Sequence, residues 1–294
     1  MREDDWLNLY SIGGYVFSIT GCDAELHEMA NAVYSGARVA AGTAGITFRI
    51  SRIEESAAHV YCMSVGGGEV CRQRSLSDFF LDVESILTQQ AMSGCRSLMQ
   101  VHAGAVAIGG AGVLICGPPE SGKTSLVVGL AGHGATILTD EVGLLQRDAT
   151  VPTAAAAAIS LVAFSRDLTV HKRTQRLFPL AAYAQEPSFK RFPDRCHVSP
   201  QKLAKSLEPP DPTPLRQLLF TSFQPGRRLS LERLGPAEAA RRLLLDTCNL
   251  ESPEGCIELI AGVVESSPAW EVLFGDAAEA SSFLATFITD ANRS

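Results

Sequence analysis

One short stretch limits what this chain can fold into more than any other: residues 117–124, which read Gly-Pro-Pro-Glu-Ser-Gly-Lys-Thr. The stretch fits the pattern G-x-x-x-x-G-K-[ST] without a gap, and that pattern is typical of a loop that binds phosphate. Residues 113–116 before it predict a short buried strand, and residues 125–131 after it predict a helix. This order points backbone N–H groups and the positive end of a helix dipole at an anion. The sequence therefore predicts an α/β fold with a nucleotide site at this loop.

Each residue of the loop, and the serine after it, is expected to line a bound ATP: Gly117, Pro118, Pro119, Glu120, Ser121, Gly122, Lys123, Thr124 and Ser125. In such loops the lysine reaches the β- and γ-phosphates, which assigns that task to Lys123. The hydroxyl that follows it is a ligand of Mg²⁺, which assigns Thr124 to the metal.

A pair of acidic residues forms the second part of the predicted site. Asp140 and Glu141 follow a predicted strand at 135–139, and Asp140 comes only 17 residues after Lys123. Ligands of open α/β sheets bind at the carboxyl ends of the strands, so both carboxylates are expected near the γ-phosphate. One can accept a proton from an attacking hydroxyl, and together with Thr124 they can hold Mg²⁺. Asp140 is the predicted general base.

His102 joins the site through a predicted hairpin. Strands at 101–108 and 113–116 flank the turn signal Gly109-Gly110. If they pair antiparallel, the start of the first strand lies beside the end of the second, at the mouth of the loop. An imidazole there can bond a phosphate oxygen or orient Asp140. The alternative is a partly buried histidine bonded to backbone, which a slip of register would favour.

These residues resemble the HPr kinase/phosphorylase family and its relatives in bacterial peptide-modification clusters. The resemblance covers residues 100–146 and rests on three segments, residues 101–104, 117–124 and 138–142. It implies a P-loop core similar to HPr kinase and phosphoenolpyruvate carboxykinase. It also implies that Asp140 is the general base toward a serine hydroxyl with His102 beside it, and it leaves homo-oligomer formation open.

The chain departs from the family pattern in ways that bear on the substrate. Pro118, Pro119 and Glu120 replace a loop that is typically richer in glycine, and Asp140-Glu141 stands where two aspartates are usual. The later glycine-rich signature is not found. These differences favour the branch of the family that acts on a peptide or small protein over a phosphorylase acting on HPr.

The pattern of elements predicts two domains, a small α+β domain at 1–95 for docking or packing and a kinase-like domain at 96–294. The first is expected to hold strands at 6–20 (with a bend or turn at Gly13-Gly14), 39–50, 59–63 and 69–72, a helix at 24–34, and an amphipathic helix at 79–90 with Phe80, Val83 and Leu87 on one side. The second continues with strands at 135–139 and 142–145, a hairpin of 215–223 with 228–233, helices at 236–248, 252–264 and 277–288, and a strand at 270–274. Residues 151–163 are either helix or ordered loop, and the proline-rich 207–214 predicts a stiff connection.

Composition excludes several classes of function. The net charge of -7 argues against a broad nucleic-acid-binding surface, and no apolar run reaches the length that a membrane span needs. The eight cysteines lack metal-ligand spacing, so we expect them to be small residues of the core. Their scattered positions also favour a cytoplasmic protein. His133 and His197 are expected to be surface or structural.

A basic segment can complete the site, because phosphoryl transfer runs largely on charge neutralisation. The candidates are Arg173, Lys190, Arg191 and Arg195, each equally consistent with a solvated face. The favoured function is an ATP-dependent kinase acting on a serine hydroxyl of a peptide or small protein. The alternatives are a nucleotide-binding regulatory module without chemistry and, ranked last, an enzyme acting on a small molecule.

Overall fold

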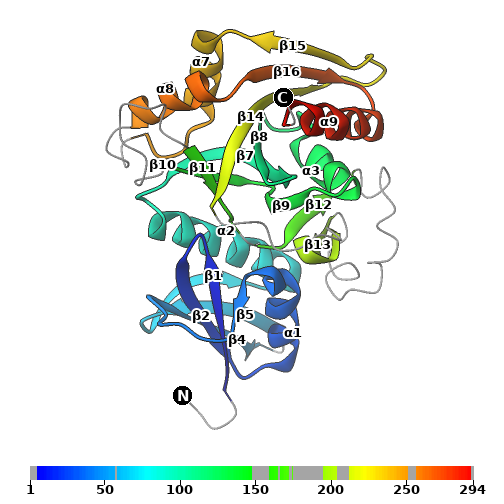
Figure 1. Cartoon of the computed structure of the whole chain (residues 1–294). Helices are drawn as coiled ribbons and strands as arrows, with labels where there is room; N and C mark the ends of the chain where they lie inside the picture. The colour runs from blue at the N-terminus through cyan, green and yellow to red at the C-terminus, as the bar shows by residue number, and fades with distance from the viewer. Residues whose placement is uncertain are drawn as a thin grey trace. The chain divides into compact units, whose positions relative to one another are not determined.

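The computed structural model describes residues 5–56, 58–147, 159–164, 166–171, 174, 195–203, 212–250 and 256–292. Its strands form three sheets and, with the helices, a mixed α/β fold (Figure 1). The chain divides into two compact units: unit 1 comprises the described residues within 1–95, 165–172 and 180–199, and unit 2 comprises the others. Whether independent domains lie at 1–95 and 96–294 stays a prediction.

Unit 1 is built on a six-stranded sheet in the order β3 (Arg38–Val39), β1 (Trp6–Ile12), β2 (Tyr15–Gly21), β4 (Thr47–Glu55), β5 (Ala58–Val65) and β6 (Gly68–Gln73). The strand-like segment at 6–20 is a hairpin of two strands, and Gly13 and Gly14 supply the positive φ angles of its turn, 57° and 82°. The prediction of a single strand at 39–50 is wrong. It is divided into β3 and β4, because the glycine-containing residues 40–46 leave the sheet and Gly42 has a φ of 154°.

Two helices complete the core of unit 1, and each begins at a capping side chain. The Asp23 carboxylate accepts a hydrogen bond from the Leu26 N–H at 3.0 Å and starts α1 (Ala24–Val33), as predicted. The Ser75 hydroxyl accepts one from the Asp78 N–H at 3.3 Å and starts α2 (Leu76–Gly94). The predicted helix at 79–90 was too short at both ends, but its apolar stripe is buried as expected.

A short two-stranded sheet distant in the sequence also belongs to unit 1. It pairs β12 (Leu168–His171) with β13 (Arg195–Val198). Just before it, the Asp167 carboxylate accepts hydrogen bonds from the Gly36 N–H at 2.9 Å and the Ser35 N–H at 3.3 Å, at a 3-10 turn, η1 (Ser35–Ala37). These contacts bind this pair of strands to the N-terminal part of the chain.

The centre of unit 1 holds a buried ionic cluster around Glu84 of α2. Its carboxylate pairs with the Arg166 guanidinium, accepts a hydrogen bond from the Thr169 hydroxyl at 2.7 Å, and lies 3.1 Å from His197 Nε2. Burial by itself would raise the pKa of Glu84, but the hydrogen bond with His197 and the charge of Arg166 outweigh it and hold that pKa well below its usual range. The expectation that His197 is structural is confirmed.

Unit 2 is built on an eight-stranded sheet whose strands are β7 (Met99–Ile108), β8 (Ala111–Cys116), β9 (Thr136–Thr139), β10 (Val142–Arg147), β11 (Ile159–Val162), β14 (Thr213–Phe223), β15 (Ser230–Leu234) and β16 (Ala269–Phe274). The order is β11-β10-β7-β8-β14-β16-β15, with β9 paired to β7. Because β11 also pairs with β14, the five strands β11, β10, β7, β8 and β14 close into a ring.

Three predictions for unit 2 are corrected by this sheet. The hairpin of 215–223 with 228–233 is wrong: β14 and β15 both pair with β16, whose buried Val272 and Phe274 favour a place between two strands. Residues 159–162, left as helix or loop, are strand β11, and residues 148–158 lie outside the described residues. The proline-rich connection ends early, because β14 already starts at Thr213, whereas residues 207–211 are not described.

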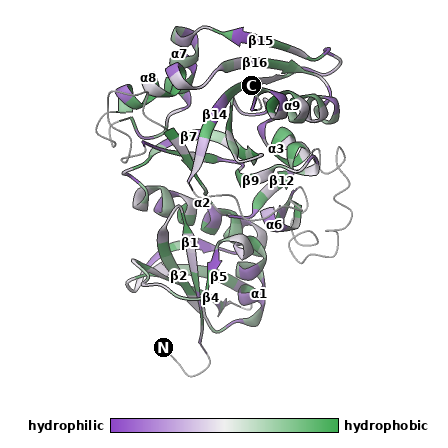
Figure 2. Cartoon of the chain, in the orientation of Figure 1, coloured by the Kyte–Doolittle hydropathy of each residue, from purple (hydrophilic) through white to green (hydrophobic). Residues whose placement is uncertain are grey.

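Helices cover both faces of the unit 2 sheet. They are α3 (Lys123–Gly132), α6 (Pro200–Leu203), α7 (Pro236–Asp246), α8 (Cys256–Ser266) and α9 (Ala277–Ala291). Val101 and Ala103 of β7 pack in one apolar core with Leu243 of α7 and Val263 of α8. Hydrophobic and hydrophilic residues alternate along α7 and α8 in Figure 2, as expected for helices with one buried face. Helix α7 ends two residues before the predicted Cys248, and the predicted start of α8 at Ser252 is not described.

Two further sequence expectations are settled by burial. Six of the eight cysteines are buried, whereas Cys22 and Cys248 are exposed, so the prediction that all of them are core residues is wrong for these two. Among the helices that the structure describes, none has the length and apolar character to cross a membrane.

Candidate nucleotide site

The 117–124 loop joins the end of β8 to the start of α3, as predicted, and two of its glycines are required by its shape. Gly117 has a φ of 145° and Gly122 a φ of 91°. A Cβ at Gly117 would lie 2.8 Å from the Thr221 carbonyl oxygen, and one at Gly122 would lie 2.5 Å from Cζ of Phe274. The backbone of the loop therefore adopts a path that a larger residue at either position would disturb.

Lys123 folds back over the loop that precedes it. Its side chain is buried, and Nζ donates hydrogen bonds to the carbonyl oxygens of Gly117 at 2.6 Å and Pro118 at 3.0 Å. Burial lowers the pKa of the ammonium, and nearby acidic groups oppose that change, Asp246 most strongly and Glu141 more weakly. The ammonium thus has neutral hydrogen-bond partners and a partly compensated charge.

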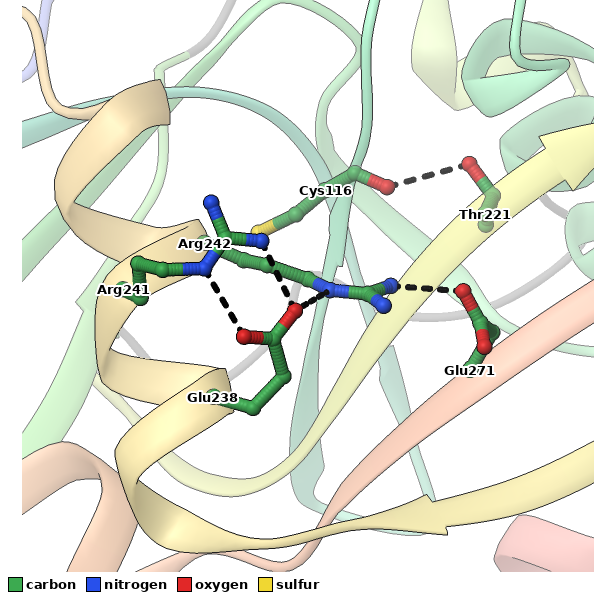
Figure 3. A network of polar contacts seen from close by, with 6 residues as sticks. All are labelled: Cys116, Thr221, Glu238, Arg241, Arg242 and Glu271. Atoms are coloured by element: carbon green, nitrogen blue, oxygen red, sulfur yellow. Dashed lines mark hydrogen bonds and ion pairs between the residues drawn. The ribbon is translucent and has the colours of Figure 1, made fainter.

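Side chains from neighbouring elements hold the loop. Ser121 Oγ lies 3.0 Å from Thr221 Oγ1 of β14, and the Thr221 hydroxyl donates to the Cys116 carbonyl oxygen at 3.0 Å (Figure 3). Ser125 Oγ, in the first turn of α3, lies 3.1 Å from Thr174 Oγ1. The other predicted nucleotide-binding positions are accessible: Pro118, Pro119 and Glu120 are exposed and Thr124 is half-buried.

His102 lies where the predicted hairpin register puts it. Ala103 pairs with Cys116 on β8, and His102 itself pairs with Val142 on β10. Side chains alternate along a strand, and a Cβ at Gly104 would meet Val127 of α3 at 2.7 Å, so His102 shares the α3 face of the sheet. The half-buried imidazole is therefore on the face that carries Lys123. Its chemical role stays a prediction.

Asp140 and Glu141 form the corner between β9 and β10. The Thr139 hydroxyl oxygen accepts hydrogen bonds from the N–H groups of Glu141 and Val142, both at 3.2 Å, and the Glu141 carbonyl oxygen accepts one from Ala103 N–H at 3.1 Å. Since β8 and β9 both run antiparallel to β7, their carboxyl ends point the same way. However, β7 lies between them, so the acidic corner is one strand further from the loop than the order of elements along the chain suggests.

Asp246 is a residue of this region that sequence reasoning missed. Its carboxylate is half-buried at the end of α7, and burial raises its pKa, while the charge of Lys123, the N–H of Gly117 and the charge of His102 act in the opposite direction. An acidic residue in the last turn of a helix is disfavoured by the helix dipole, and that unusual position was the available signal.

The four basic residues that were candidates for contacting phosphate are not placed at the loop. Arg195 is the first residue of β13 and belongs to unit 1. Arg173, Lys190 and Arg191 lie outside the described residues. A contact of any of these four residues with phosphate stays a prediction.

No protein-family model matches this chain, and no curated protein matches it. The structure of the Hpr(Ser) kinase/phosphatase from Coxiella burnetii is similar to it, with 13% sequence identity and a TM-score of 0.26, over 66% of this chain and 95% of that one. A similarity of this extent carries no argument about activity, so the role of this site has to be inferred from its own residues.

Proposed function

We propose that unit 2 is an ATP-dependent phosphotransferase that transfers the γ-phosphoryl group to a hydroxyl group, and that the acceptor is a serine of a peptide or small protein. The observation that carries the proposal is the 117–124 loop, held between a buried strand and α3, with Lys123 bent over its mouth. The acidic corner at Asp140 and Glu141 follows on a strand of the same direction. The serine acceptor is what the family resemblance implies.

The residues present fit a nucleotide with its metal. Exposed loop positions, two glycines with positive φ and the first turn of α3 form the kind of backbone cradle that binds phosphate. Mg²⁺ is usually bound through one or two carboxylates together with phosphate oxygens and water. Within the described residues no group of three or more His, Cys, Asp or Glu side chains could hold a metal, and a Mg²⁺ shared with phosphates needs no such group.

The chain's own residues divide the reaction among them. The loop amides and Lys123 bind and neutralise the phosphates, and the Thr124 hydroxyl with Asp140 and Glu141 would hold the metal. Bound ATP supplies the phosphoryl group. The Asp140 carboxylate takes the proton of the acceptor hydroxyl. At the same time the acceptor oxygen forms a bond to the γ-phosphorus, and the bond from that phosphorus to the leaving ADP breaks. His102, as the family resemblance implies, would sit beside this acid and orient it.

A second candidate is a regulatory module that binds the nucleotide without transferring phosphate. Exposed Glu120, with a φ of 64°, adds an anion to the loop, and this favours a site in which chemistry is absent. Both candidates predict nucleotide binding, and only the first predicts a phosphorylated product.

The test separates binding from transfer. Wild-type protein and Asp140→Asn would be incubated with γ-labelled ATP, Mg²⁺ and an array of serine-containing peptides, with nucleotide affinity measured by calorimetry. We expect Asp140→Asn to keep ATP binding, because Lys123, Thr124 and Glu141 still hold the nucleotide and its metal. Its transfer rate should fall by about 10² to 10⁴, the usual contribution of general base catalysis. Transfer at the normal rate would remove Asp140 from the base position. ATP binding without labelled product in the wild type would favour the regulatory module.

A further inference from the structure

Asp246 occupies a position that its own helix does not favour. It is the last residue of α7, where the helix dipole repels a carboxylate. The helix is closed there by other groups: the Thr247 hydroxyl donates to the Leu243 carbonyl oxygen at 2.8 Å, and the Thr247 N–H donates to the Leu244 carbonyl oxygen at 3.3 Å. The acid is therefore not needed to end the helix.

The segment after Asp246 fills a place beside β7 that β8 leaves open. The last β8 residue paired with β7 is Cys116, opposite Ala103. Beyond that point Thr247 forms a β-bridge with Val101, and the Cys248 N–H donates to the Gln100 carbonyl oxygen at 2.7 Å. Asp246 is thus fixed where the chain leaves β8 to form the 117–124 loop.

The side chain of Asn249 secures this segment from the other end. Its Oδ1 accepts a hydrogen bond from the Gln100 N–H at 2.8 Å, and its Nδ2 donates to the Leu98 carbonyl oxygen at 2.8 Å. With this set of bonds just after it, the backbone at Asp246 is tied to β7 much as a short strand would be.

The Asp246 carboxylate influences groups that a phosphate would also use. Lys123 and the Gly117 N–H each lower its pKa against the effect of burial, and Asp246 is in turn the strongest acidic influence on Lys123. The ammonium of Lys123, which bonds directly to the carbonyl oxygens of Gly117 and Pro118, is thus influenced by the charge of Asp246 without forming an ion pair with it.

We propose that Asp246, which its backbone bonds to β7 fix at the start of the 117–124 loop, is the resident counter-ion of that loop, a positioning residue whose charge offsets that of Lys123 in the nucleotide-free protein and opposes an entering polyphosphate. The inference rests on the proposed function only in assuming that the loop binds nucleotide. It assigns Asp246 an unfavourable effect on nucleotide affinity, because its charge competes with and repels the phosphates.

The decisive variant is Asp246→Asn, which keeps the size and a hydrogen-bond acceptor and removes the charge. We expect it to bind ATP about three- to tenfold more tightly than the wild type in calorimetry at low salt, as for the loss of a partly screened like charge. The difference should shrink as salt is raised, which a merely structural effect would not produce. Asp246→Glu keeps the charge and should stay within about twofold of the wild type.

The matched control is Glu238→Gln, which removes the same charge from the same helix at an exposed ion pair and should leave ATP affinity unchanged. Thermal unfolding would establish that each variant is folded. Unchanged or weaker ATP binding by folded Asp246→Asn would overturn the counter-ion role while leaving the proposed function intact. Failure of the wild type to bind ATP would instead remove the proposed function itself.

Discussion

Units 1 and 2 each bury a basic side chain, but they compensate its charge in different ways. Arg166 in unit 1 pairs directly with Glu84, which also interacts with Thr169 and His197. Lys123 in unit 2 donates instead to two neutral carbonyl oxygens of its own loop. The charge of Arg166 is neutralised by a buried carboxylate, so this residue stabilises the fold. The direct hydrogen-bond partners of Lys123 are neutral, so its ammonium can still attract an anion.

The two cations also differ in what they contribute to stability. Replacing one member of a buried ion pair leaves the other without compensation, and the free energy of unfolding falls. Removing a buried ammonium that is hydrogen-bonded to carbonyl oxygens relieves a desolvation penalty and gives up only the charge interaction with half-buried Asp246. The clusters around Arg166 and Lys123 should therefore respond to substitution in opposite ways, and experiments on variants of each can test that contrast.

The largest effect is expected for Lys123→Ala. Transfer should fall by more than about 10³, because the phosphates lose the ammonium that neutralises them. The melting temperature should stay the same or rise, since the buried charge is gone. Labelled-phosphate transfer and calorimetric unfolding would be measured side by side. A large loss of stability would show that Lys123 is as structural as Arg166.

Glu84→Gln should be the most destabilising of these substitutions. It leaves the Arg166 guanidinium buried without its carboxylate, which costs about 3 to 5 kcal/mol. Chemical denaturation would give the free energy of unfolding, and ATP binding by the remaining folded protein should equal that of the wild type. If ATP affinity fell in parallel, the separation of the two clusters into a structural and a functional one would fail.

The stabilising effect of the Glu84 cluster should depend on pH. The pKa of Glu84 is held below its unfolded value, so its ionisation stabilises the folded state at pH values above that unfolded value, about 4.3. This stabilisation should be lost progressively as pH falls below about 4. Denaturation of the wild type and Glu84→Gln across pH 3 to 7 should show the two stabilities converging in acid. Parallel curves would exclude Glu84 as the source.

The smallest effect is expected for Arg241→Ala on α7. Arg241 forms an exposed ion pair with Glu238 at an N···O distance of 2.8 Å, drawn as a dashed line in Figure 3. Pairs of this kind contribute less than about 1 kcal/mol. Because Arg242 also bonds Glu238, the acid keeps a partner in the variant. The free energy of unfolding should change by no more than about 0.5 kcal/mol. A greater loss would mean that surface pairs of unit 2 contribute to stability as buried ones do.

Much of the local structure could be predicted from the sequence. The Gly13-Gly14 turn, the Asp23 cap and the loop from Gly117 to Thr124 all depend on residues that are neighbours in the chain. The register that puts Ala103 opposite Cys116 follows in the same way from the short Gly109-Gly110 turn. The sequence prediction failed locally at residues 39–50. The strand-like composition there was given more weight than the glycines that interrupt the strand.

Adjacent residues were enough to determine the strand, loop and helix around Lys123, because they set φ angles, caps and tight turns. The folded chain alone revealed that β16 separates β14 from β15, that the end of α7 is tied to β7 beside the loop through the Thr247–Val101 bridge, and that Glu84 meets Arg166 and His197. These contacts join residues far apart in the chain. The order of strands and the packing of helices select them, and neither is encoded in any one stretch of residues.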